Sequence, residues 1–350
     1  MTKSETLMRQ EIGQQPQVLS TLLDRETENT FRAAAQVATT HQVRYVLVAA
    51  RGTSDNAARY GQYLLGAHNR LTVALATPSL YSVYGRPPRL EGALVIGISQ
   101  SGQSPDIVAV LAEGRRQGVP TVAITNDTES PLAAQADFVI PLHAGPELSV
   151  AASKTYTAEL VALALLSCAL GGTGERLDQL QTIPQAVEEV LQVEDLVTRA
   201  VERYRYAESC VVQGRGYNYS TAFEIALKLK ELSYVIADAY SSADFMHGPS
   251  AMLSEGFPAL VVAPSGEMYD TMRDFSLELR SRGAELLVIS DRTELLDEAV
   301  TPLPLPRRLP EWLSPITAAI LGQLFALHLT KVKGYDPDRP RGLTKVTITR

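Results

Sequence analysis

The stretch VLVAARGTS, at residues 46–54, decides the fold because a related stretch, CVVQGRGYN at residues 210–218, follows 164 residues later. Each stretch is an apolar run rich in valine, followed by Arg-Gly and polar residues. Two further pairs of motifs share this spacing: Ser101-Gly102 with Ser265-Gly266, and Asp127 with Asp291. Three matches at one spacing predict that the chain contains two copies of one structural unit.

In each copy, short β-branched runs alternate with longer helical patterns. This alternation predicts parallel strands joined by right-handed crossovers, with helices on both faces of the sheet. The strands expected in the first copy are 44–50, 72–76, 93–99, 121–125 and 138–142. Apolar residues at helical spacing predict a helix after Ser104. Residues 174–204 predict a helical connection between the copies, and a last helix is expected at about 313–332.

The composition is that of a soluble globular protein, with 45% hydrophobic and 20% charged residues. A net charge of −7 offers no basic surface for nucleic acid, so no nucleic-acid partner is expected. The apolar stretches 158–170 and 316–329 are too short or too polar to cross a bilayer, and they predict buried helices without a membrane partner. The first residues do not form an export signal, so we expect a cytoplasmic protein.

Cysteine and histidine usage bears on metal binding. The two cysteines, Cys168 and Cys210, each lie in an apolar run and are expected to be core residues. They exclude a disulfide scaffold and a CxxC metal site. No second histidine or cysteine stands at ligand spacing from His247, so no metal ion is predicted.

Two loops after predicted strands are rich in hydroxyl groups: RGTSD at 51–55 and SQSGQSPD at 99–106. In a doubly wound sheet, ligands bind beyond the carboxyl ends of the strands, where such loops turn into helices. Free N–H groups at a helix start attract anions, so these loops are candidates to hold a phosphate without a lysine. Neither loop has a nucleotide-binding glycine pattern, which favours a small phosphorylated molecule and predicts no cofactor. The alternative is that the serines only cap helices.

The segment TAFEIALKLKELSY, residues 221–234, predicts a helix with acid and base on one face. Glu224, Lys228 and Glu231 fall at positions i, i+4 and i+7. A carboxylate beside an ammonium can serve as a proton-transfer pair. The alternative is structural, since Thr221 with Glu224 matches a capping box and Glu224 with Lys228 matches a surface ion pair.

Two more residues stand where side chains can reach a ligand. His247 is followed by Gly-Pro, which predicts a turn in which the imidazole can reach a ligand. Lys345 lies in the proline-rich tail 336–346, which predicts either a frayed end or a segment held against the body. In the second case its amine can form an imine with a carbonyl compound.

Together these motifs resemble the sugar isomerase (SIS) domain family, specifically the isomerase half of glutamine:fructose-6-phosphate aminotransferase. The resemblance extends over nearly the whole chain, through these motifs: RQEI at 9–12, QP at 15–16, SQSG at 99–102, GPE to SK at 145–154, the helix 224–231, HGP at 247–249, and PR to K at 340–345. It implies two tandem doubly wound parallel-sheet domains of the flavodoxin-like, three-layer α/β/α type. The implied divisions are an N-terminal helical segment 1–30, a first SIS domain 31–172, a helical linker 173–204, a second SIS domain 205–335, and an active-site tail 336–350.

The resemblance also implies roles for individual residues. Those expected to hold a sugar phosphate are Gly52, Thr53, Ser54, Ser99, Gln100, Ser101, Ser104 and Val150. Glu231 resembles the base that moves a proton between C1 and C2, with Lys228 and Glu224 beside it. His247 resembles the ring-opening residue that a neighbouring subunit contributes, which implies a homodimer. Lys345 resembles the amine that forms an imine with the ketose.

The family's synthase carries a preceding glutaminase domain with a catalytic N-terminal cysteine, whereas this sequence has no cysteine before Cys168. We therefore expect the reverse use of the site: a glucosamine-6-phosphate deaminase that yields fructose 6-phosphate and ammonia. The alternatives are a deaminase or isomerase for galactosamine 6-phosphate or a fructosamine 6-phosphate, ammonia-dependent synthesis, and a sugar-phosphate sensor. A sensor needs only the serine loops, so the joint presence of Glu231, His247 and Lys345 argues against it.

Overall fold

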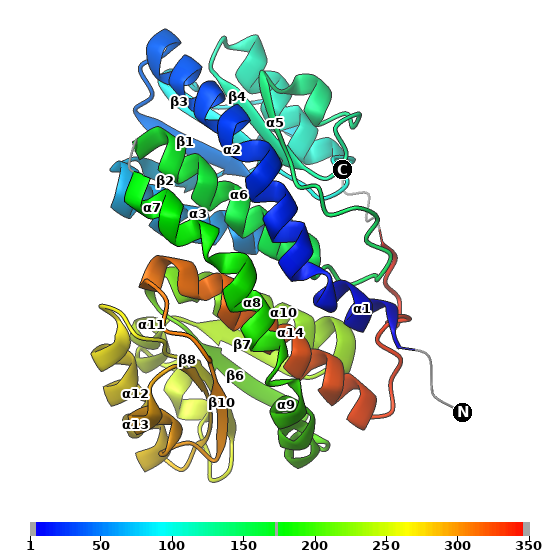
Figure 1. Cartoon of the computed structure of the whole chain (residues 1–350), viewed down its shortest axis with the longest axis vertical. Coiled ribbons are helices and arrows are strands. Elements are labelled where there is room, and N and C mark those ends of the chain that lie inside the picture. The colour runs from blue at the N-terminus through cyan, green and yellow to red at the C-terminus, as the bar shows by residue number, and fades with distance from the viewer. Residues whose placement is uncertain (1–4, 172–173, 346–350) are drawn as a thin grey trace. The chain divides into compact units, whose positions relative to one another are not determined.

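The computed structural model describes residues 5–171 and 174–345, which fall into two compact units (Figure 1). The first-repeat unit contains the described residues of Gln15–Glu147, Lys154–Thr182 and Thr344–Arg350. The second-repeat unit contains those of Met1–Gln14, Leu148–Ser153 and Ile183–Leu343. Each unit holds one of the two predicted sheets.

The sheet of the first-repeat unit has five parallel strands in the order β2-β1-β3-β4-β5. The strands are β1 (Tyr45–Ala49), β2 (Thr72–Leu75), β3 (Ala93–Ile98), β4 (Thr121–Thr125) and β5 (Phe138–Pro141). The helices are α2 (Gln15–Thr40), α3 (Gly52–Asn69), α4 (Ser79–Ser82), α5 (Pro105–Arg116), η1 (Ala133–Gln135), α6 (Lys154–Gly171) and α7 (Gly174–Gln181). Each predicted strand agrees with its observed strand to within one residue at either end.

The second-repeat unit repeats this topology, with its parallel sheet in the order β7-β6-β8-β9-β10. The strands are β6 (Ser209–Gln213), β7 (Ile236–Tyr240), β8 (Pro258–Val262), β9 (Glu285–Ser290) and β10 (Thr301–Pro304). Its main helices are α1 (Leu7–Gly13), α8 (Ile183–Leu191), α9 (Glu194–Ala200), α10 (Tyr219–Lys228), α11 (Ser242–Met246), α12 (Tyr269–Ser281), α13 (Thr293–Leu296) and α14 (Ser314–Val332). Short helical turns are η2 (Val201–Tyr204), η3 (Gly216–Asn218), η4 (Leu229–Ser233), η5 (Pro249–Met252) and η6 (Glu311–Leu313). Because the order matches that of the first sheet, the predicted duplication and the flavodoxin-like fold are confirmed.

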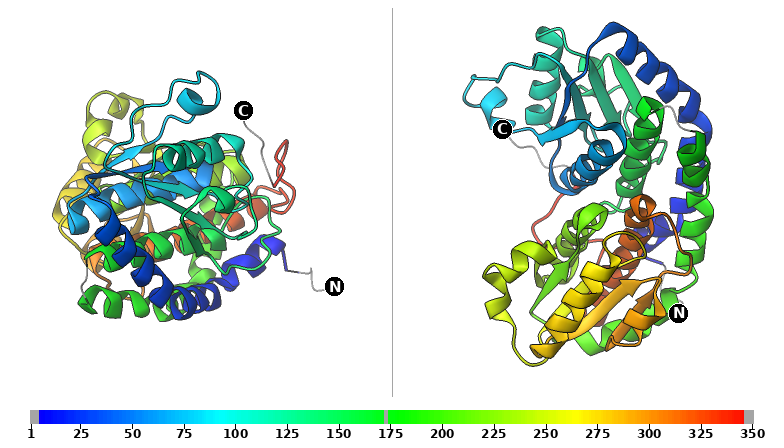
Figure 2. Two further views of the ribbon diagram at one scale, coloured as in Figure 1. Left: turned by 90° about the horizontal axis from the view of Figure 1, so that it is seen from above. Right: turned by 90° about the vertical axis from the view of Figure 1, so that its left-hand side faces the viewer.

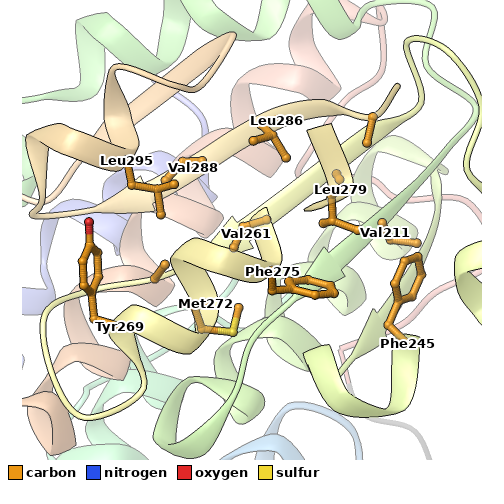
Figure 3. Packing of buried hydrophobic residues seen from close by; sticks show 13 residues of the cluster. Val211, Phe245, Val261, Tyr269, Met272, Phe275, Leu279, Leu286, Val288 and Leu295 are labelled. Carbon is orange, nitrogen blue, oxygen red and sulfur yellow. The ribbon is translucent and has the colours of Figure 1, made fainter. Parts of the chain in front are cut away.

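Helices cover both faces of each sheet (Figures 1 and 2). In the first-repeat unit, Val95 and Ala123 face Ile107 and Leu111 of α5. In the second-repeat unit, strand residues including Val211 and Val261 pack against α12 and against α11 (Figure 3). Side chains alternate between the faces of a strand, so each sheet supports apolar packing on both sides.

Among residues 5–171 and 174–345, two helices are apolar and long enough to cross a membrane by length and composition, Lys154–Gly171 and Glu311–Val332, so the expectation that these stretches are too short or too polar for that is wrong. They are 83% and 100% buried inside the structure, as expected for core helices. Cys168 and Cys210 are free and buried, which confirms their expected core placement. The helices α8 and α9 of the expected connection pack against α14, so this segment contributes to the core of the second-repeat unit.

The Arg-Gly pairs that revealed the repeat adopt the same backbone conformation. Gly52 has φ 54° and Gly216 has φ 61°, both in the left-handed region that favours glycine. The preceding residues, Arg51 and Arg215, are extended, with φ −140° and −144°. Each glycine therefore turns the chain from the first strand of its repeat directly into a helix.

Candidate functional site

The first candidate phosphate loop lies between β1 and α3. Gly52, Thr53 and Ser54 form the start of α3, as expected for residues after a strand. The Ser54 hydroxyl is buried and donates a hydrogen bond to Glu159 Oε1 at 2.7 Å. Thr53 is half-buried. The loop thus presents the N-terminus of an 18-residue helix, while Ser54 also joins α3 to α6.

The second candidate loop follows β3 and leads into α5. Ser99 Oγ accepts from the N–H of Gly102 at 3.1 Å, and Ser101 Oγ accepts from that of Gln103 at 3.3 Å. Ser104 occupies the N-cap position, but its side chain makes no capping hydrogen bond. The position of Ser104 before Pro105 at the start of the helix is therefore as the sequence indicates, while its hydroxyl does not serve as the cap.

An ion pair connects the two loops of the first-repeat unit. Arg51 donates from Nε and Nη2 to Asp106 Oδ2, at 2.8 and 2.7 Å. The Asp106 side chain is almost fully buried, whereas that of Arg51 is half exposed. The pair therefore places the guanidinium of Arg51, with its charge balanced by Asp106, at the carboxyl ends of β1 and β3, where a ligand is expected.

The predicted acid and base face is real, and it is buried in the second-repeat unit. Lys228 Nζ lies 3.5 Å from Glu224 Oε1 and 2.6 Å from Glu231 Oε2. The side chains of Glu224 and Lys228 are 1% exposed, and that of Glu231 is 24% exposed. A surface ion pair is therefore excluded. Of the two carboxylates, Glu231 is the one that solvent or a ligand can reach.

The backbone around these residues departs from the regular helix expected at 221–234. α10 starts at Tyr219, so Thr221 lies inside the helix and bonds Asn218 Oδ1 through its hydroxyl at 3.0 Å. The capping-box interpretation is therefore wrong. After Lys228 the helix widens into a π-turn, Leu229–Ser233, which carries Glu231 and ends at Tyr234 with φ 57°. Such turns are found frequently at functional sites.

His247 lies at the C-terminal end of α11, and its residue is exposed. The helix is anchored two residues earlier by Phe245, which is fully buried and meets Phe275 edge-on at 6.2 Å between ring centroids. Gly248 follows with φ 139°, so the chain turns sharply after the histidine. The predicted turn is therefore confirmed.

Lys345 is held against the first-repeat unit. Its Nζ lies 2.8 Å from Glu147 Oε2, and the lysine side chain is 25% exposed. Glu147 itself is fixed by Thr155, whose N–H and hydroxyl donate to its two oxygens at 3.1 and 2.9 Å. Of the two tail interpretations, the frayed one is thus excluded for Lys345.

The tail that leads to Lys345 has two anchors in the second-repeat unit. Asp338 accepts from the N–H groups of Leu7 and Met8, at 2.8 and 3.1 Å. The N–H of Arg341 donates to the Tyr234 hydroxyl at 2.8 Å, and its guanidinium lies 3.8 Å from the centroid of the same ring. Because Tyr234 closes the π-turn of Glu231, the second anchor joins the tail to the segment that carries the candidate base.

Val150, the remaining predicted ligand residue, lies in the segment Leu148–Ser153 of the second-repeat unit. The N–H groups of Leu148 and Ser149 donate to Glu11. The carbonyl of Ser153 accepts from Gln323 Nε2 at 3.1 Å. The segment that carries Val150 is thus fixed at both ends.

Three interactions were not predicted from the sequence: Lys345 with Glu147, Ser54 with Glu159, and Arg51 with Asp106. Glu159 could have been found, because a lone carboxylate within the apolar run 158–166 requires a buried hydrogen-bond donor. Glu147 and Asp106 gave no such signal, since neither stands within an apolar run. Within 5–171 and 174–345, no three His, Cys, Asp or Glu side chains converge to hold a metal ion.

Two regions of the chain, 41–169 and 204–330, match the sequence profile described as the SIS domain, one in each repeat. The glutamine–fructose-6-phosphate aminotransferase of Pyrococcus horikoshii is 33% identical over 352 residues. This match covers 98% of the chain but only 58% of the length of that relative.

Solved structures resemble the whole chain. One is a Silicibacter pomeroyi protein inferred to be a phosphosugar isomerase, with 31% identity, a TM-score of 0.86, and coverage of 95% of this chain and 100% of that one. Another is the C-terminal domain of glucosamine-fructose-6-phosphate aminotransferase from Francisella tularensis, with 26% identity and a TM-score of 0.83. It covers 97% of this chain and 99% of that one.

Proposed function

The chain belongs to the SIS domain family, and from this premise we propose that it is a phosphosugar isomerase that acts on an amino sugar phosphate. The reaction is aldose–ketose isomerisation coupled to deamination: glucosamine 6-phosphate and water give fructose 6-phosphate and ammonia. The observation that carries the proposal is the buried group of Glu224, Lys228 and Glu231, in which one carboxylate remains accessible.

The phosphate is assigned to the two loops of the first-repeat unit, with Gly52, Thr53 and Ser54 in one and Ser99, Gln100, Ser101 and Ser104 in the other. Helix starts with hydroxyl side chains bind phosphate through N–H groups and through the positive end of the helix dipole. The uncommitted Ser104 hydroxyl supports this assignment. Val150 is proposed to contact the sugar.

Proton transfer is assigned to Glu231. Isomerisation of an open-chain amino aldose requires a base that removes the C2 proton and returns a proton at C1. The Lys228 ammonium, 2.6 Å from Glu231 Oε2, holds this carboxylate in one orientation. Glu224 lies on the other side of the same ammonium and holds it in place. The ketose-level imine that results is hydrolysed by water to the ketose and ammonia.

Lys345 and His247 complete the proposal. Lys345 is assigned as an amine that forms an imine with the ketose carbonyl, with release of one water that is taken up again when hydrolysis of this imine frees the ketose and the amine. Its partner Glu147 would hold the amine in position and accept a proton from it. The exposed His247 is assigned to ring opening in a neighbouring subunit, which makes the active form a homodimer. No cofactor or metal is part of this mechanism, and the cytoplasm is the proposed location.

Ammonia-dependent synthesis is the second candidate function. The similarity to glutamine–fructose-6-phosphate aminotransferases favours it, because the same groups catalyse both directions of one equilibrium. A comparison of initial rates from the two sides separates the candidates: glucosamine 6-phosphate on one side, and fructose 6-phosphate with ammonium chloride on the other. Galactosamine 6-phosphate and a fructosamine 6-phosphate complete the panel.

The experiment that tests the site uses Ser101→Ala beside Glu231→Gln. We expect Ser101→Ala to raise the KM for the sugar phosphate while kcat changes less, since it weakens phosphate binding. Glu231→Gln should lower kcat by about 10²–10⁴-fold, the usual contribution of a general base. Binding of the sugar phosphates without turnover on any substrate of the panel would overturn the enzyme proposal and leave a sensor.

A further inference from the structure

In the second repeat, the start of α12 binds an anionic group that belongs to the chain itself. The N–H of Glu267 donates to Glu311 Oε2 at 2.7 Å, and the N–H of Met268 donates to Oε1 at 3.3 Å. Consecutive amides at the start of a 13-residue helix therefore engage both oxygens of one carboxylate. Phosphate and carboxylate ligands bind to helix starts in the same way.

The surrounding backbone leaves room for this group. Gly266 has φ 153°, and a Cβ at this position would lie 2.4 Å from the carboxyl carbon of Glu311. Gly216, in the loop after β6, also faces it, since a Cβ there would lie 3.7 Å from Glu311 Oε1. Glycines from two loops thus line the position that the carboxylate occupies.

The same loop holds a polar group that the carboxylate leaves unsatisfied. The Ser265 side chain is buried, with the residue 3% exposed, and its hydroxyl has no hydrogen-bond partner among the described residues. Its N–H donates to Asp291 Oδ1 at 2.6 Å. A buried hydroxyl without a partner destabilises the folded state, so its retention calls for an explanation. A phosphate has more oxygens to offer than a carboxylate.

The first repeat gives the comparison. At a spacing of 164 residues, Gly266 and Met268 correspond to Gly102 and Ser104 of the serine-rich loop. In the described part of the chain, no carboxylate accepts from the corresponding amides of Gln103 and Ser104. The two repeats therefore share one loop position, which a carboxylate fills only in the second.

We infer that residues 265–268 form a second phosphate-binding loop, and that Glu311 keeps it closed by placing its own carboxylate where a phosphate would bind. Tethering favours this internal ligand, because a group on the same chain acts at a high effective concentration. This statement rests on the proposed function: the chain then binds one sugar phosphate, at the loops of the first repeat. The closure by Glu311 does not itself depend on that function.

The test removes the carboxylate and supplies inorganic phosphate. In Glu311→Ala, we expect saturable phosphate-dependent shifts of the Glu267 and Met268 amide resonances, measured by NMR against sodium chloride at equal ionic strength. Phosphate a few-fold above its Kd should also raise the unfolding midpoint of this variant by about 2–4 °C more than that of the wild type. The wild type should show neither effect at these two amides.

The matched control is Glu267→Ala, which removes an exposed carboxylate from the same loop and the same amount of charge. It should behave as the wild type. Phosphate-independent amide resonances in folded Glu311→Ala would overturn the inference, as would identical shifts in the wild type. If Glu311→Ala does not fold, Glu311→Gln provides the test: phosphate should shift the two amides more than in the wild type, and equal behaviour overturns the inference. No sugar or catalytic readout is involved, so failure here is separate from failure of the proposed function.

Discussion

Replacing Lys228 by methionine tests whether the buried charges of the second-repeat unit depend on one another. Glu224 and Lys228 are both 1% exposed, so the substitution removes an ammonium from beside a carboxylate that has almost no access to water. Breaking one side of a buried ion pair typically costs about 3–5 kcal/mol. We expect Lys228→Met to lower the free energy of unfolding by that amount near pH 7, measured by urea denaturation.

The double variant Glu224→Gln with Lys228→Met distinguishes charge from packing. Removal of both charges should recover most of the lost stability, because replacing a buried pair by neutral groups of similar size is often nearly neutral. Activity should not return, since Glu231 loses the ammonium that lies 2.6 Å from it. Equal destabilisation of the single and double variants would refute the reasoning, because the effect would then come from lost packing around the lysine stem.

Three further predictions concern stability, the tail and the thiols. Burial alone would raise the pKa of Glu194, but hydrogen bonds from His328 and Arg9 lower it to about 2. Glu194→Gln should therefore lower the free energy of unfolding by up to about 3 kcal/mol at pH 7. In urea denaturation, this difference from the wild type should vanish as the pH falls from about 4.5 toward 2. Arg341→Ala removes the guanidinium stacked on Tyr234. We expect faster proteolysis of the C-terminal tail and a lower kcat. Unchanged proteolysis would contradict the role of Arg341 as an anchor of the tail. Burial raises the pKa of Cys210 to about 12, so the native protein should leave this thiol unlabelled by iodoacetamide at pH 8, and labelling without unfolding would contradict that burial.

The fold could be predicted from the sequence because its signals are local and repeated. The valine-rich strands ending in Arg-Gly mark the start of each sheet, and a spacing of 164 residues relates the corresponding strands. Both the strand boundaries and the buried apolar helices followed from hydrophobic patterns alone. The π-turn after Lys228 did not, because a one-residue change in helix winding leaves the i, i+4 and i+7 pattern almost intact.

The candidate site was predictable residue by residue, while its interactions were not. Glu231, His247 and Lys345 stood out through their motifs, yet the partner of Lys345 is Glu147, which lies 198 residues away in the sequence. Likewise, the Ser-Gly match at 265–266 suggested two similar loops. Only the structure shows Glu311, 44 residues after Glu267, on the amides of the second loop.

The measurement that tests the central claim most directly is product formation from glucosamine 6-phosphate by the wild type, Glu231→Gln and Lys230→Gln. Lys230 is exposed on the same π-turn and serves as the matched control. We expect ammonia and fructose 6-phosphate in equal amounts from the wild type and Lys230→Gln, and a rate lower by about 10²–10⁴-fold in Glu231→Gln. Equal rates in Glu231→Gln and the wild type, or no product from a wild type that binds the sugar, would contradict it.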